Sequence, residues 1–111
     1  MRNVGKLSAA IATIVIAFLL GLVTASARET SKTIAIDGTS FRPRDITVSV
    51  NDAVEWVNKD PFPHNVTSKA GAFQSGNLQP DGKWQFRATS RGTFEYVCTL
   101  HPGMKAVLRV R

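Results

Sequence analysis

Apolar and polar residues alternate in short runs along the chain after residue 27. In one such run Val54 and Trp56 flank Glu55. A period of two is typical of strands that bury one face, and helical periodicity is nearly absent from this part of the sequence. The alternating runs occupy residues 33–37, 46–50, 54–56, 83–87, 93–96 and 105–110. This pattern predicts an all-β protein.

Turn-forming pairs separate the runs, among them Asp37-Gly38, Asn51-Asp52 and Asp81-Gly82. Glycine, asparagine and aspartate favour turns, and asparagine tolerates the left-handed backbone conformation. We therefore expect Asn51 to adopt a positive φ. Short strands at this spacing, without a helix long enough for a crossover, predict one antiparallel β-sandwich. A chain of 111 residues has room for a single domain.

The first 27 residues have a different pattern. A basic start precedes an almost unbroken apolar run over residues 7–23, and the small-residue motif Ala-Ser-Ala follows at 25–27. This order is typical of a secretory signal peptide. We expect residues 1–27 to be a signal peptide that is removed after Ala27, and residues 28–111 to form the mature, periplasmic domain. The alternative is an uncleaved N-terminal membrane anchor.

The distribution of charged residues argues against nucleic acid as a partner. The formal net charge is +6, but the basic residues are scattered, and no basic helix or basic stretch interleaved with aromatic residues is present. We expect no binding to nucleic acid, and no membrane contact once the signal peptide has been removed. The charge is interpreted as a solvated surface that influences the choice of a protein partner. The mature protein is expected to be a monomer.

Candidate metal-ligating side chains are few. The chain has one cysteine, Cys98, two histidines, His64 and His101, and one methionine beyond the initiator, Met104. An unpaired cysteine in an exported protein needs an explanation, and metal ligation provides one. Two imidazoles, a thiolate and a weak thioether suit a mononuclear blue-copper site. Structural zinc usually takes four strong nitrogen or sulfur ligands, which makes zinc the poorer match.

The alternation also predicts where these side chains point. Cys98 has the same parity as Tyr96, and Met104 has the same parity as Ala106. Both are therefore expected to face the interior at one end of the sandwich, with His101 in the tight loop between them. Taken singly, each residue would be ordinary packing or surface. The shared direction and the spacing favour a common copper site.

The stretch from Phe94 to Met104, Phe-Glu-Tyr-Val-Cys-Thr-Leu-His-Pro-Gly-Met, resembles the last strand and ligand loop of the cupredoxins, the small type 1 copper proteins. Within that family the spacing Cys-x-x-His-x-x-Met is most similar to amicyanin, and plastocyanin is also similar. Residues 41–48 and 52–58 resemble further segments of the family. The resemblance implies a Greek-key sandwich and one type 1 copper ion per chain, held by His64, Cys98, His101 and Met104.

The resemblance also implies a set of hydrogen bonds around the ligands. In the family, the asparagine after the first histidine meets the hydroxyl residue that follows the cysteine, and an amide reaches the thiolate. These positions are Asn65 and Thr99 in this chain. We expect the two side chains to bridge the ligand-bearing segments.

The function expected from this set is that of a small exported electron carrier that cycles between Cu(I) and Cu(II). The alternative is a periplasmic copper-binding or copper-handling protein without redox turnover. An enzyme is not expected, because no histidine remains for a second copper. The partner is expected to be a redox protein, either a c-type cytochrome or a periplasmic oxidoreductase. The apolar patch expected to meet it around His101 consists of Phe62, Pro63, Leu100, Pro102 and Gly103.

Overall fold

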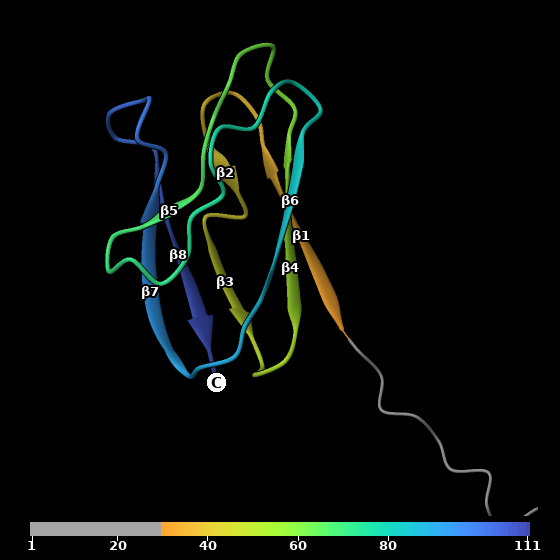
Figure 1. Ribbon diagram of the computed structural model, residues 1–111, viewed down its shortest axis with the longest axis vertical. Helices are drawn as coiled ribbons and strands as arrows, with labels where there is room; N and C mark the ends of the chain where they lie inside the picture. The colour runs from red at the N-terminus through yellow and green to blue at the C-terminus, as the bar shows by residue number, and fades with distance from the viewer. Residues whose placement is uncertain (1–29) are drawn as a thin grey trace, which may run out of the picture.

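The protein is a sandwich of two four-stranded β-sheets (Figure 1). The computed structural model describes residues 30–111, so the predicted signal peptide lies outside the described residues. In this part of the chain no helix is long and apolar enough to span a membrane. The strands are β1 (Ser31–Ile36), β2 (Phe41–Arg42), β3 (Asp45–Val48), β4 (Ala53–Asn58), β5 (Thr67–Ser68), β6 (Lys83–Arg87), β7 (Gly92–Val97) and β8 (Lys105–Val110).

The two sheets have the strand orders β2-β1-β4-β6 and β3-β8-β7-β5. The prediction of an antiparallel sandwich was wrong in one respect, because two of the strand pairs are parallel. β1 runs parallel to β4 along its whole length, and β3 runs parallel to β8. The remaining pairs, β1 with β2, β4 with β6, β5 with β7 and β7 with β8, are antiparallel.

The parallel pairs arise from the way the chain changes sheets. After β2 the chain crosses to the second sheet as β3, and then returns to the first sheet as β4 beside β1. Two successive crossings between layers bring β4 back in the direction of β1. Alternation along a strand indicates which face is buried, but it carries no information about the neighbouring strand or its direction. The sequence pattern therefore could not distinguish the two arrangements.

Large apolar side chains from both sheets fill the space between them. Trp56 of β4 and Tyr96 of β7 are both fully buried. Their rings meet edge to face with centroids 5.6 Å apart, and the Trp56 indole N–H donates to the Tyr96 hydroxyl oxygen at 3.3 Å. Burial raises the pKa of the Tyr96 hydroxyl to about 12, against a smaller opposing effect of the hydrogen bond from Trp56. The hydroxyl thus remains neutral inside the core.

At the edge of the core, the burial of the aromatic side chains does not follow the alternation along the strands. Trp84, Phe86 and Phe94 are only partly buried. Phe73 lies outside the strands, in the segment between β5 and β6, yet it is buried and its ring centroid is 4.8 Å from that of Phe86.

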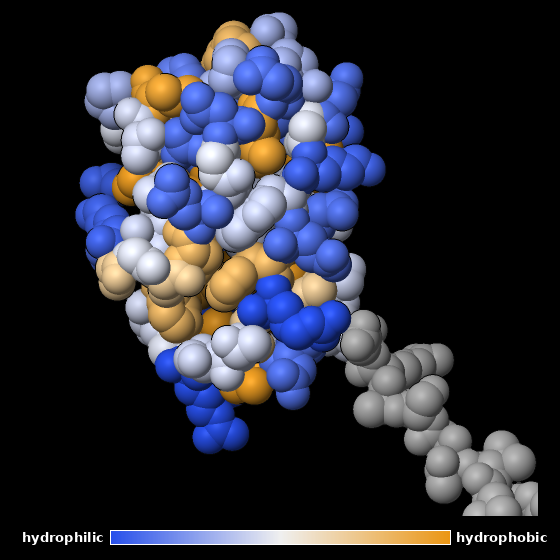
Figure 2. Space-filling model, in the orientation of Figure 1, coloured by the Kyte–Doolittle hydropathy of each residue, from blue (hydrophilic) through white to orange (hydrophobic). Residues whose placement is uncertain are grey.

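On the face shown in Figure 2, hydrophilic side chains dominate the upper half and apolar side chains gather in the lower half. A sandwich of this size leaves some apolar surface exposed.

The turns bring the candidate ligands to one end of the sandwich. The segment between β4 and β5 and the loop between β7 and β8 both lie at the end opposite to the C-terminus (Figure 1). At the other end Asn51 has a φ of 78°, which confirms the left-handed conformation expected from its sequence. The predicted turn at Asp81-Gly82 also contains a positive φ, of 64° at Asp81.

Candidate metal centre

His64 lies between β4 and β5 and is fully buried. Its backbone pairs with that of Leu78, because the His64 N–H donates to the Leu78 carbonyl at 3.1 Å and the Leu78 N–H donates back at 2.7 Å. This isolated antiparallel bridge fixes the backbone of His64 without a long strand. The imidazole can therefore be directed into the interior from a loop.

Cys98 and Met104 lie at the two ends of the loop between β7 and β8. The Cys98 N–H donates to the Met104 carbonyl at 3.0 Å, and the Met104 N–H donates to the His101 carbonyl at 3.2 Å. The thiol and the thioether are both buried, whereas His101 is half-buried. The antiparallel register of β7 and β8 ends at Val97 and Lys105, so three candidate ligands belong to one short hairpin loop.

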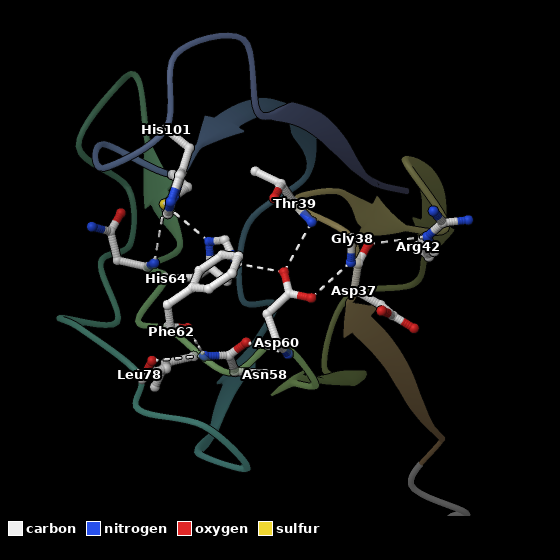
Figure 3. A network of polar contacts seen from close by, with 12 residues as sticks. Asp37, Gly38, Thr39, Arg42, Asn58, Asp60, Phe62, His64, Leu78 and His101 are labelled. Carbon is white, nitrogen blue, oxygen red and sulfur yellow. Dashed lines mark hydrogen bonds and ion pairs between the residues drawn. The ribbon is translucent and has the colours of Figure 1, made fainter.

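The nitrogen and sulfur atoms of three candidates converge on one point. Cys98 Sγ is 3.7 Å from His64 Nδ1 and 3.6 Å from His101 Nδ1. One ligand atom from each of the three residues lies within 4.8 Å of the others. Figure 3 shows the two imidazoles turned toward the sulfur from different segments of the chain. Both histidines therefore offer Nδ1 to the same small volume.

Met104 lies beside this cluster. It lines the same surface hollow as Cys98 and His101. The donor set is thus one soft cysteine sulfur and two imidazole nitrogens, with a buried thioether close by. Such a set fits copper, which accepts two histidines and a cysteine with a weak axial methionine. It fits structural zinc less well, because a thioether is a poor fourth ligand for that ion.

Asn65 connects the two ligand-bearing segments. Its side-chain N–H₂ donates to Thr99 Oγ1 at 2.7 Å, and its Oδ1 accepts the Thr99 backbone N–H at 3.0 Å. The Asn65 backbone N–H also points to Cys98 Sγ at 3.4 Å. The structure thus brings together Asn65, Thr99 and the thiol in the manner that the family resemblance implies. Hydrogen bonds of this kind orient the ligands and tune a bound metal.

Asp60 is a further residue of the site that was not predicted from the sequence. This carboxylate is 6% exposed, and its Oδ2 lies 2.7 Å from His64 Nε2. A signal was present, because an aspartate four residues before a candidate histidine ligand can supply the carboxylate that often binds the second imidazole nitrogen. Aspartate before proline is also an ordinary turn signal, so the sequence alone does not single out this pair.

The predicted apolar patch lies around His101. Phe62 and Leu100 are 40% and 46% exposed, respectively. The Phe62 ring centroid is 5.2 Å from that of His64 and 5.5 Å from that of His101. Pro63 is half-buried, and Pro102 and Gly103 are exposed. One candidate ligand thus reaches a surface whose neighbouring side chains are apolar.

Comparison with known proteins assigns the family. The model of the cupredoxin-like domain matches residues 10–110. The chain belongs to this family. The resemblance found in its ligand loop is therefore confirmed, and this cupredoxin is a distant homologue of amicyanin and plastocyanin.

Two relatives and one solved structure show how similar this chain is to known proteins. Amicyanin from Paracoccus denitrificans is 31% identical over 70 residues, which are 59% of this chain and 53% of the relative. Chloroplastic plastocyanin from Physcomitrium patens is 32% identical over 83 residues, or 63% of this chain and 49% of the relative. The cupredoxin thus spans about half the length of these curated relatives. The copper-containing nitrite reductase from Thermus scotoductus superposes with a TM-score of 0.71 at 28% identity, over 80% of this chain and 24% of that chain.

Proposed function

We propose that this cupredoxin is a small exported blue-copper electron carrier. The observation that carries the proposal is the convergence of Cys98 Sγ with the Nδ1 atoms of His64 and His101. These three residues would hold the copper, and Met104 would supply a weaker thioether ligand. Bound copper would supply a one-electron Cu(II)/Cu(I) couple.

The protein supports such a site by limiting the movement of its ligands. His64 is held by its bridge to Leu78, and the Cys98 loop is held by backbone hydrogen bonds across its ends. Asn65 joins the two segments through Thr99. Ligands that are already fixed before a metal binds need to move little when the metal ion gains or loses an electron. This rigidity favours electron transfer over the release of a copper ion.

The position of His101 suggests how the carrier meets its partner. Its half-buried ring lies beside the exposed Phe62. A small apolar surface suits the brief contacts made by redox proteins. The proposed partner is a c-type cytochrome or a periplasmic oxidoreductase, approached by a monomeric carrier in the periplasm. The scattered basic side chains would then accelerate association with an acidic partner.

An enzymatic role is less favoured. The superposed nitrite reductase is an enzyme, but this cupredoxin corresponds to only 24% of that chain. The sequence has two histidines, and both belong to the cluster already described. We therefore propose a carrier and not an enzyme. Copper handling without redox turnover is the remaining alternative, because it would use the same ligands.

The ligand assignment is tested by copper titration of the mature protein. Wild-type protein should bind one copper(II) per chain and develop an intense visible thiolate-to-copper band. Cys98→Ser should abolish the band, because it removes the only thiolate of the chain. Leu100→Ser is a matched control in the same loop and should keep it. A Cys98→Ser protein that remains blue would refute the site.

The carrier role is tested by stopped-flow kinetics with a soluble cytochrome c. Phe62→Glu and Pro102→Glu should slow electron transfer while leaving the visible spectrum nearly unchanged. Lys83→Glu, on the exposed side of β6, should alter mainly the salt dependence of the rate. Copper(I)-only binding, followed by transfer of the ion to an apo-protein, would instead support the copper-handling alternative.

A further inference from the structure

Asp60 is a buried carboxylate that belongs to neither the core nor the set of candidate ligands. Its Oδ2 lies 2.7 Å from His64 Nε2, on the side of the imidazole opposite to the Nδ1 that faces Cys98 (Figure 3). An ionised carboxylate can only accept hydrogen bonds. At this distance the proton of a neutral His64 must therefore be on Nε2, and Nδ1 must present its lone pair.

The carboxylate is itself held from a distant part of the chain. The backbone N–H of Gly38 donates to Asp60 Oδ1 at 2.8 Å, and that of Thr39 donates to Oδ2 at 2.9 Å. Both residues are central in the turn between β1 and β2, in which the Asp37 N–H donates to the Ser40 carbonyl at 3.0 Å. The turn thus directs two adjacent amides at one buried side chain.

The backbone of this turn is unusual. Gly38 has a φ of 60° and Thr39 has a φ of 57°. Two consecutive positive φ angles are required by the tight turn that matches the twist of a hairpin. A β-branched residue is rarely found in this conformation, and such an outlier often accompanies a functional constraint. In this conformation the Gly38 and Thr39 amides are both directed at Asp60.

The end of β4 provides a further restraint. The Asp60 N–H donates to Asn58 Oδ1 at 3.0 Å, and the Asn58 side-chain N–H₂ donates to the carbonyls of Phe62 and Leu78, each at 2.9 Å. Burial raises the pKa of the Asp60 carboxyl, but the hydrogen bonds from Thr39, His64 and Gly38 outweigh it and lower the pKa below its ordinary value. Its two oxygens face two backbone N–H donors and the imidazole, an arrangement that suits an ionised carboxylate, which can only accept hydrogen bonds.

We propose that Asp60 is a positioning residue of the metal centre, which sets the tautomer of His64 and makes that ligand more electron-rich. A carboxylate that accepts the second N–H of a ligating histidine fixes the ring and raises the basicity of the nitrogen that binds the metal. Its charge favours Cu(II) over Cu(I), so it should lower the reduction potential. The effect on potential rests on the proposed copper function, whereas the effect on the tautomer does not.

The tautomer is measured on the metal-free full-length mature protein by long-range ¹H–¹⁵N NMR of the imidazoles. Wild-type His64 should carry its proton on Nε2 alone. Asp60→Asn replaces two acceptor oxygens by one and adds an N–H₂ group, so its His64 should populate both tautomers. Asp37→Asn removes a charge from the same turn without touching His64, and should behave as wild type. A wild-type His64 that carries its proton on Nδ1 would overturn the proposal, even if Asp60→Asn fails to fold.

The potential is measured on the copper-loaded proteins. Asp60→Asn should weaken the preference for Cu(II) over Cu(I) about tenfold, which corresponds to a potential higher by about 59 mV for a one-electron couple. Asp37→Asn should leave the potential unchanged. Equal rises in both variants would refute a specific role of Asp60. A wild-type protein with the Nε2 tautomer but without copper binding would refute the carrier function and the effect on potential, while confirming that Asp60 sets the tautomer.

Discussion

The core around Trp56 and the loop end around His64 are both buried, but different interactions hold them together. In the core, side chains from regular strands pack by shape, and the Trp56–Tyr96 contact is a hydrogen bond between two large rings. At the loop end several of the buried side chains are polar, and all of these are hydrogen-bonded within residues 30–111. They are Asn58, Asp60, His64 and Asn65.

This difference predicts different sensitivities. A packed core responds mainly to a change in volume, because lost contacts and the cavity left behind both cost free energy. A polar cluster responds to the loss of one partner, because the remaining buried group is left without a hydrogen bond. Truncation of a large core side chain should thus cost the most free energy of unfolding, and removal of one hydrogen-bonding side chain at the loop end should cost less. Four predictions test this comparison in the metal-free protein.

The largest effect is expected in the core. Trp56→Ala should lower the free energy of unfolding by about 3–5 kcal/mol, because it removes a fully buried indole. Chemical denaturation followed by circular dichroism measures the change. Trp84→Ala is the matched control, since Trp84 packs on the same cluster but is only partly buried. Equal losses of unfolding free energy in the two variants would contradict the prediction that the fully buried Trp56 contributes more to stability than the partly buried Trp84.

Alkaline pH should weaken the same region. The neutral Tyr96 hydroxyl is favoured in the folded state, where its pKa is about 12 against the ordinary value of 10.0. Stability should therefore be complete below about pH 10 and should fall as the pH rises through about 12, by roughly 3 kcal/mol in total. Denaturation at a series of pH values measures this, and phenolate absorption reports on Tyr96 alone because it is the only tyrosine. Tyr96→Phe should remove this component of the pH dependence, and its persistence would contradict the assignment.

A smaller loss is expected at the loop end. Asn65→Ala should lower the free energy of unfolding by about 1–3 kcal/mol, because the two hydrogen bonds between its side chain and Thr99 are lost. Asn77→Ala serves as the control, since Asn77 is exposed and shares one longer hydrogen bond with Asn65. If both variants unfold at the same denaturant concentration as wild type, the bridge between the two segments contributes nothing to stability.

The smallest effect is expected for the exposed pair of Asp45 and Arg109, which lies in neither region. Its two hydrogen bonds are 3.0 and 3.1 Å long, and the hydrogen bond from Arg109 lowers the pKa of the Asp45 carboxyl. Solvent and salt screen such pairs. Asp45→Asn should leave the denaturation midpoint unchanged at physiological salt. A shift as large as that of Asn65→Ala would contradict this ranking.

The sequence pattern predicted the side chains that belong to regular strands. Ile34, Trp56 and Leu108 are fully buried, as their alternation indicates. The pattern failed where a position depends on a distant segment. The direction of β4 relative to β1 follows from two crossings between the sheets, and no residue in either strand encodes it. Phe73 lies in a segment without periodicity, so nothing local marked it as part of the core.

The candidate ligands were found because their types and spacing are rare, and because the loop between Cys98 and Met104 is short. Asp60 was missed for the opposite reason. Aspartate before proline is a common turn signal, and its unusual role depends on the amides of Gly38 and Thr39, more than 20 residues earlier in the chain. A single sequence does not show that these amides come close. Local chemistry was therefore easier to predict than its supporting hydrogen bonds.

The origin of the ligands in two different layers has a consequence for the order of assembly. His64 follows β4 of the first sheet, whereas Cys98 and His101 follow β7 of the second. A folding chain cannot gather these side chains until both sheets have formed and docked face to face. The ability to capture a metal ion should therefore appear late in refolding, after most of the secondary structure. Metal capture then serves as a natural reporter of the final alignment of the two layers.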